Sequence, residues 1–168
     1  MNDYKSIFVG IAEAEIGTRE HGGNNRGERI AAYQSATWLD PDAWPWCAAF
    51  VCWCIKEWLK VPGAAESIGV GNAEKWRPQT PSAFDFLRWA KEKDLRVLDE
   101  AAEVHAGDLV VFDFSHIGIV IEDALKGSQF LICVEANTNG TGSRDSASGD
   151  GVWRKKRART LARNFIRL

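Results

Sequence analysis

The sequence of 168 residues has little net charge, no long apolar run and no leader-like start. A formal net charge of −2 argues against a general nucleic-acid-binding protein, because such a protein needs a basic surface for the phosphate backbone. No apolar segment approaches the roughly 20 residues that a membrane-spanning helix needs, so we expect no membrane span. Residues 1–5 lack the pattern of a signal peptide. We therefore expect synthesis in the cytoplasm, with a separate exit route for any action outside it.

Cysteine is scarce, and its spacing matches no common zinc-binding pattern. The four residues are Cys47, Cys52, Cys54 and Cys133. A disulfide framework is not expected in a chain of this size without an export signal. We interpret the last three as small buried hydrophobic residues that stay reduced, and we expect neither a metal nor another cofactor.

The first part of the chain has helical patterns, and the last part is rich in predicted strands. Apolar spacing predicts helices over residues 3–16, 28–35 and 82–93, and Ser82 is the expected N-cap of the last of these. A further helix is predicted after Pro45 and a short one near residues 72–76. Residues 61–70 are predicted to form a loop. Branched and aromatic runs predict strands over 109–114, 117–121, 129–134, 152–157 and 163–168, with a loop over 137–150. We therefore predict a single α+β domain over residues 1–168, with N-terminal helices packed on a C-terminal antiparallel β-sheet.

Cys47 stands where a helix is predicted to begin. Pro45 cannot lie inside a helix, so the apolar helix that follows starts at or just after it and holds Cys47 in its first turn. Unpaired N–H groups and the positive end of the helix dipole stabilise a thiolate there, and a thiolate is the nucleophilic form of cysteine. Cys47 is therefore the candidate nucleophile.

A nucleophilic cysteine needs a base within hydrogen-bond reach, and the sequence has only three histidines. His21 lies in a glycine-rich loop, His105 lies at a turn, and His116 begins a predicted strand. A histidine beside apolar strand residues is more often structural, but polar residues at the end of the next strand favour a catalytic role here. Glu135 and Asn137 alternate onto one face of that strand. An antiparallel hairpin would bring Glu135 near His116, where a carboxylate fixes the tautomer.

Five segments carry a resemblance that spans nearly the whole chain. They are Asn24-Asn25, Pro45-Trp46-Cys47-Ala48-Ala49-Phe50-Val51, Ala106-Gly107-Asp108-Leu109-Val110-Val111-Phe112, Ser115-His116-Ile117-Gly118-Ile119-Val120 and Val134-Glu135-Ala136-Asn137-Thr138. In this order they resemble the CHAP branch of the NlpC/P60-type cysteine peptidoglycan hydrolases, which share a papain-like fold. The cysteine helix and the Gly-Asp-strand-His segment are the most specific marks of that family.

The resemblance implies a catalytic set and a substrate class. In it Cys47 is the nucleophile, His116 is the general base and Glu135 orients His116, while Asn137 assists orientation or polarises the intermediate. The backbone N–H of Cys47 would hold the oxyanion. The implied substrates are amide bonds of bacterial peptidoglycan, either the N-acetylmuramoyl-L-alanine link or bonds within the stem peptide and its bridges.

Some members of the family bind calcium through an acidic loop ahead of the cysteine. Asp40 and Asp42 precede Cys47 here, but their spacing does not match that loop, so we still expect no metal. We expect no separate wall-binding module beside the predicted domain. This suits a compact monomeric lysin, released through a holin-type pore, or a toxin delivered by a secretion system with an immunity partner.

Trp44, Trp46 and Asn25 are candidate substrate-binding residues, although packing alone would explain the two tryptophans equally well. Two other interpretations of the chain stay open. The same site would suit a protein substrate, or the domain is a non-catalytic module whose basic C-terminus contacts an anionic wall. A solvated face of the last strands is the simpler explanation of that basic stretch. Its members are Arg154, Lys155, Lys156, Arg157, Arg159, Arg163 and Arg167.

Overall fold

The computed structural model describes residues 4–141 and 149–168, which form an α+β fold. The helices are α1 (Tyr4–Glu13), α2 (Glu28–Gln34), α3 (Cys47–Trp58), α4 (Ala64–Ser67), α5 (Ala73–Trp76) and α6 (Asp85–Glu92). The strands are β1 (Arg96–Leu98), β2 (Leu109–Phe112), β3 (Ile117–Val120), β4 (Phe130–Thr138), β5 (Gly151–Ala158) and β6 (Ala162–Arg167), with a short 3₁₀ helix at Arg159–Leu161. This arrangement confirms the predicted fold class.

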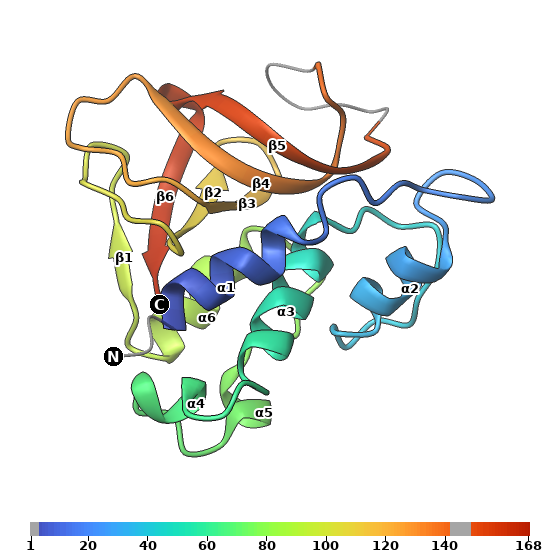
Figure 1. Cartoon of the computed structure of the whole chain (residues 1–168), viewed down its shortest axis with the longest axis horizontal. Coiled ribbons are helices and arrows are strands. Elements are labelled where there is room, and N and C mark those ends of the chain that lie inside the picture. Colours follow the sequence, from blue (N-terminus) through green and yellow to red (C-terminus); the bar gives the residue numbers. More distant parts are fainter. Residues whose placement is uncertain (1–3, 142–148) are drawn as a thin grey trace.

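The strands form one antiparallel sheet in the order β1-β6-β2-β3-β4-β5. Helices α1 and α3 pack on one face of it, through contacts with β3 and β4 (Figure 1). Successive strand residues point to opposite faces. In β2, Leu109 and Val111 accordingly join the core beneath the helices, whereas Val110 and Phe112 join a second apolar cluster on the other face. Both faces of the central sheet are therefore buried, which explains the continuous apolar run of this strand.

Helix α3 lies at the centre of the larger core, and nine of its twelve residues are buried. A helix buried nearly all round must be apolar nearly all round, as this one is. Its neighbours on either side are α1 and α2. The segment that carries Cys47 is therefore the most enclosed helix of the fold, and its N-terminus is fixed by packing.

Several local predictions need correction. Residues 61–70, predicted as a loop, contain α4, and the three-residue strand β1 was not predicted. Ser82 does not cap α6, which begins at Asp85 after Phe84. Instead the Thr80 hydroxyl accepts the Ser82 N–H and donates to the Asp85 carboxylate, so a side-chain turn precedes the helix. Within the predicted loop 137–150, the first two residues belong to β4, and residues 142–148 lie outside the described part of the chain.

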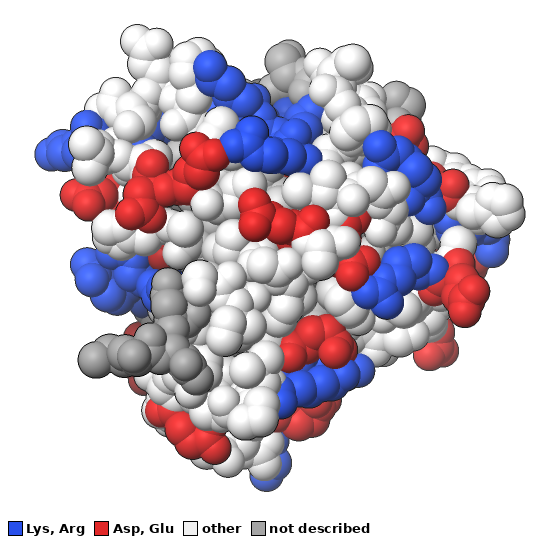
Figure 2. Space-filling model, in the orientation of Figure 1, with Lys and Arg blue, Asp and Glu red and all other residues white. Residues whose placement is uncertain are grey.

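The basic C-terminus is only in part the solvated face that the sequence suggested. Lys155, Arg157 and Arg159 are at most 6% exposed, whereas Arg154 and Lys156 point to solvent. Period-two alternation along β5 accounts for the division. On the face shown in Figure 2, basic and acidic side chains are interspersed and do not gather by sign.

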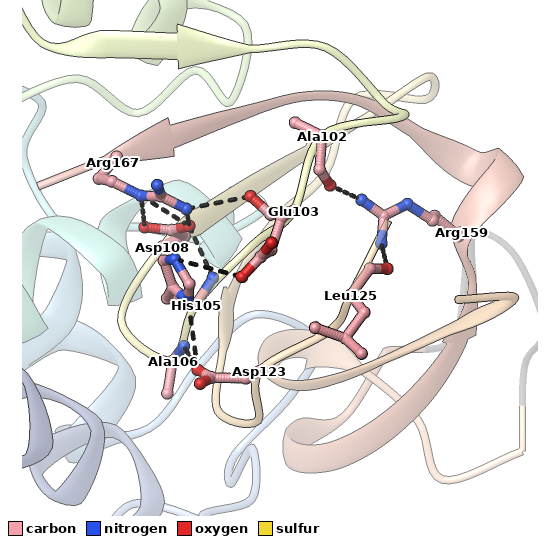
Figure 3. A network of polar contacts seen from close by, with 9 residues as sticks. All are labelled: Ala102, Glu103, His105, Ala106, Asp108, Asp123, Leu125, Arg159 and Arg167. Atoms are coloured by element: carbon pink, nitrogen blue, oxygen red, sulfur yellow. Dashed lines mark hydrogen bonds and ion pairs between the residues drawn. The ribbon is translucent and has the colours of Figure 1, made fainter. Parts of the chain in front are cut away.

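One buried carboxylate shows how a basic residue ties the C-terminus to the rest of the fold (Figure 3). Asp108, which is fully buried, accepts hydrogen bonds from Arg167 Nη2 at 2.8 Å and from the backbone N–H of His105 at 2.9 Å. Arg159 donates nearby to the carbonyls of Ala102 and Leu125. These contacts hold the segment before β2 against the last strand.

Candidate active site

Cys47 is the first residue of α3, as predicted from Pro45. The first intrahelical hydrogen bond runs from the Phe50 N–H to the Trp46 carbonyl at 2.9 Å. The N–H groups of residues 47–49 therefore precede the helical ladder and point toward the end of the helix where the dipole is positive. The thiol is 6% exposed. This position favours negative charge on sulfur and on a substrate oxygen beside it.

His116 lies immediately before β3 and joins Cys47 to Glu135. Its Nε2 lies 2.8 Å from Glu135 Oε2, and its side chain also interacts with that of Cys47. Because Nε2 is engaged by the carboxylate, Nδ1 is the ring nitrogen that remains to serve the thiol. The His116 side chain is 5% exposed. The residues predicted as nucleophile, base and orienting carboxylate therefore lie in one connected line.

Gly118 lets the carboxylate reach the imidazole. Glu135 is paired with Gly118 across the β3–β4 ladder, whereas His116 stands two residues earlier on the same face. A Cβ atom at position 118 would lie 2.7 Å from Glu135 Cγ, closer than real carbon atoms approach. The absence of a side chain at 118 therefore gives Glu135 the space in which it lies over β3 and meets His116.

The electrostatic environment favours an imidazolium. Burial lowers the pKa of His116, but its interactions with Cys47 and Glu135 raise that pKa to about 10. Burial raises the pKa of Glu135, and the hydrogen bonds from His116 and Arg157 outweigh it, so the pKa is lowered. A charged imidazole next to a thiol stabilises the thiolate.

The other three thiols have a different environment. Cys52, Cys54 and Cys133 are free and buried, as predicted. Burial raises the pKa of Cys52 to about 12 and raises the pKa of the other two well above the ordinary value. These thiols stay protonated at neutral pH and are packing residues.

Arg157 is a residue of the site that the sequence analysis missed. It is 1% exposed and donates to Glu135 through Nε, at 2.9 Å to Oε1, and through Nη2, at 2.6 Å to Oε2. In the sequence Arg157 belongs to a basic run, and nothing in that run indicates that it pairs with Glu135. The alternation of β5 was the available signal, because it separates Lys155 and Arg157 from the exposed Arg154 and Lys156.

Asn137 makes a second network and does not contact His116 through any hydrogen bond found in the described residues. A bulge interrupts β4 between Ala136 and Thr138, and Asn137 has a φ of 55° there. Its amide donates to Asn25 Oδ1 at 2.7 Å and to Glu20 Oε1 at 3.3 Å. The bulge therefore turns Asn137 away from the regular alternation that placed it beside Glu135.

Glu20 was also missed, and it links this second network to the residue that precedes Cys47. Glu20 Oε1 accepts a hydrogen bond from the indole N–H of Trp46 at 2.9 Å, and Trp46 directly precedes Cys47 in the chain. Trp46 is fully buried and stacks on Tyr33 with ring centroids 5.5 Å apart, so packing is the interpretation that its position supports. Trp44 is half-buried and donates its indole N–H to the Asp40 carbonyl at 2.8 Å.

The remaining histidines lie apart from this constellation. His21 is exposed, and His105 lies 3.9 Å from Glu103 and 3.7 Å from Asp123 in the network of Figure 3. Within residues 4–141 and 149–168, no group of three or more His, Cys, Asp or Glu side chains is placed to hold a metal ion. Over the same residues, no helix is long and apolar enough to cross a membrane.

An α+β fold with this line of residues at a helix start belongs to the papain-like class. The CHAP domain family model matches residues 39–137, and the chain belongs to the CHAP domain family. The family consists of hydrolases of amidase or peptidase type that act on peptidoglycan in the cell wall. No curated protein matches the chain. Glu20 and Arg157 both lie outside the matched residues.

Proposed function

We propose that the protein hydrolyses an amide bond of bacterial peptidoglycan, with Cys47 as the nucleophile. The observation that carries the proposal is His116, which lies 2.8 Å from the Glu135 carboxylate through Nε2 and interacts with the Cys47 side chain. The bond cleaved is either the N-acetylmuramoyl-L-alanine link or an amide within the stem peptide or its bridge. A domain of amidase or peptidase type accommodates both possibilities.

The chemistry follows from the positions of these groups. The Cys47 thiolate attacks the carbonyl carbon, and the negative charge that develops on oxygen faces the free N–H groups at the start of α3. His116 donates its proton to the departing amine, and the C–N bond breaks to leave a thioester on Cys47. His116 then takes a proton from water, which attacks the thioester and releases the acid and the thiolate.

Glu135 and Asn137 act on this reaction through their partners. Glu135 holds the Nε2 side of His116, so Nδ1 is directed at the sulfur and the imidazolium is stabilised. Asn137 acts through Glu20 and Asn25, because their network holds Trp46 and thereby the start of α3. Asn25 and Trp44 remain the candidates for contact with substrate.

Digestion of purified sacculi tests the proposal. The wild type should release soluble fragments whose masses separate stems freed from glycan from stems cut internally. Cys47→Ala should release none, because the nucleophile is absent. Fragments from both proteins would contradict the assignment of Cys47. No fragments from either protein, on walls with several bridge types, would favour a protein substrate or a binding module.

The route by which the protein reaches a wall stays a prediction. A lysin released through a holin-type pore and a toxin delivered with an immunity partner would share this site. Either role would make the protein bacteriolytic, and lysis of intact cells on addition from outside, compared with expression inside them, would separate the two routes.

A further inference from the structure

Arg157 and Glu135 form a buried ion pair directly behind the imidazole. Their side chains are at most 1% exposed, and two guanidinium nitrogens reach both carboxylate oxygens. Such a two-point contact fixes the plane of a carboxylate as well as its distance. Glu135 Oε2 is also the atom that meets His116 Nε2. The guanidinium therefore sets the direction from which the carboxylate approaches the ring.

The same aromatic rings contact the guanidinium and the imidazole. Phe114 stacks on His116 with centroids 5.7 Å apart and an interplanar angle of 7°, and Phe112 stacks on it at 5.6 Å. The Arg157 guanidinium carbon lies 5.6 Å from the Phe112 ring centroid and 5.9 Å from that of Phe114. Both cations are thus held by one aromatic pair, which restricts how either can tilt.

The charges of the four groups explain why an arginine is useful there. In the reactive state the thiolate and the carboxylate are negative, and the imidazolium is positive. Without a further cation, this buried set carries one excess negative charge, which favours the neutral thiol. Arg157 supplies the second positive charge, so the carboxylate does not depend on the imidazolium alone as its counter-ion.

We propose that Arg157 is a positioning residue that keeps Glu135 ionised and aligned, so that the His116 charge remains available to the Cys47 thiolate. The inference deepens the proposed function, since it takes Cys47 as the nucleophile. Other groups act on the same pair from neighbouring positions. Lys155 on β5 and Cys133 on β4 both interact electrostatically with Glu135 and Arg157. They are present in every variant compared below.

The test measures the rate of Cys47 alkylation by iodoacetamide from pH 4 to 10, with peptide mass spectrometry to locate the label. At low pH the alkylation rate rises with pH, and in Arg157→Gln this rise should occur about one pH unit higher than in the wild type. At a given pH on the rise, the rate should therefore be about tenfold lower. Arg157→Lys should move the rise in the same direction by less, because the charge remains but the two-point contact is lost. Sacculus digestion should show a lower kcat with KM unchanged.

Arg167→Gln is the matched control, because Arg167 makes the same kind of pair with buried Asp108 but has no link to Cys47. It should lower the melting temperature and leave the alkylation profile in place. Profiles of both Arg157 variants that superimpose on the wild type would overturn the proposal, as would an equal shift in Arg167→Gln. Arg157→Lys carries the test if Arg157→Gln does not fold.

Alkylation needs no wall substrate, so the two proposals fail separately. A shifted profile in a protein whose wild type leaves sacculi intact would support the role of Arg157 and contradict the substrate. An unshifted profile beside active digestion would contradict the role of Arg157 and leave the hydrolase assignment standing.

Discussion

Two fully buried carboxylates, Glu135 and Asp108, are each held by an arginine through more than one hydrogen bond. The two carboxylates differ in the group that each contacts besides its arginine. Glu135 meets the titratable ring of His116, whereas Asp108 accepts a backbone N–H. The Glu135–Arg157 pair therefore acts on a group that can gain or lose a proton, whereas the Asp108–Arg167 pair holds a segment of the backbone. A buried ion pair becomes part of a reactive site through what it contacts next, and burial alone does not distinguish the two.

Substituting each carboxylate by its amide separates the two roles most strongly. Glu135→Gln should lower kcat by about 100-fold or more, because the imidazolium loses its carboxylate and the catalytic tautomer is no longer held. Asp108→Asn should leave kcat within about threefold. Each variant leaves an arginine without its charge partner, so the free energy of unfolding should fall by roughly 2–3 kcal/mol in both. Both variants should therefore unfold at a lower temperature than the wild type.

Sacculus digestion, measured well below both melting temperatures, checks this prediction. Calorimetry on the same samples supplies the control for stability. Equal losses of activity in the two variants would mean that the loss reflects general weakening of the fold, and that Glu135 has no special relation to His116.

The pH dependence of catalysis sharpens the comparison next, because only one of the two pairs contacts the histidine that we propose as the base. The interactions of His116 with Cys47 and Glu135 outweigh the effect of burial and raise its pKa to about 10. A raised pKa means that the imidazolium persists at neutral pH and is lost as pH rises through the folded-state value. We therefore expect kcat/KM to fall about tenfold per pH unit above pH 10.

In Glu135→Gln the fall in kcat/KM at high pH should begin at a lower pH, because the carboxylate that favours the charged His116 ring is removed. In Asp108→Asn it should stay where it is in the wild type. Rates measured from pH 5 to 11, with a stability check at each pH, distinguish a shifted fall from alkaline unfolding. A fall that begins near pH 7 in the wild type would contradict the raised pKa of His116.

The smallest expected effect comes from crowding Glu135 without changing any charge. In Gly118→Ala the new Cβ would meet Glu135 Cγ, so the carboxylate must move away from His116. About 1 kcal/mol of lost alignment corresponds to a roughly fivefold lower kcat. Gly10→Ala in α1 is the matched control, because nothing lies within 4 Å of its added Cβ, and it should leave kcat unchanged. Equal kcat in wild type and Gly118→Ala would mean that the glycine is not needed for this contact.

The parts of the site that could be predicted are those with local sequence signals. Pro45 marks the start of the helix that carries Cys47, and hairpin spacing brings Glu135 to His116. Arg157 and Glu20 could not be assigned in this way, because the partner of Arg157 depends on strand register and the partners of Glu20 lie far from it in the chain.

The fold shows the same division between strong and weak local patterns. The start of α3 was predicted from Pro45, and the longer helices were predicted with ends that miss by up to three residues, whereas β1, at three residues, is too short to show alternation. The bulge at Asn137 has no sequence signature within the regular strand pattern, and it redirects that side chain toward Asn25.

The central claim is that Cys47 forms a covalent bond with the acyl part of a peptidoglycan amide. The most direct measurement is acid quenching of the enzyme during sacculus digestion, followed by mass spectrometry of the peptide that contains Cys47. The account predicts a thioester adduct on Cys47 whose mass identifies the acyl group, and its absence in Cys47→Ala. Active digestion that continues in Cys47→Ala, with no adduct in the wild type, would contradict it.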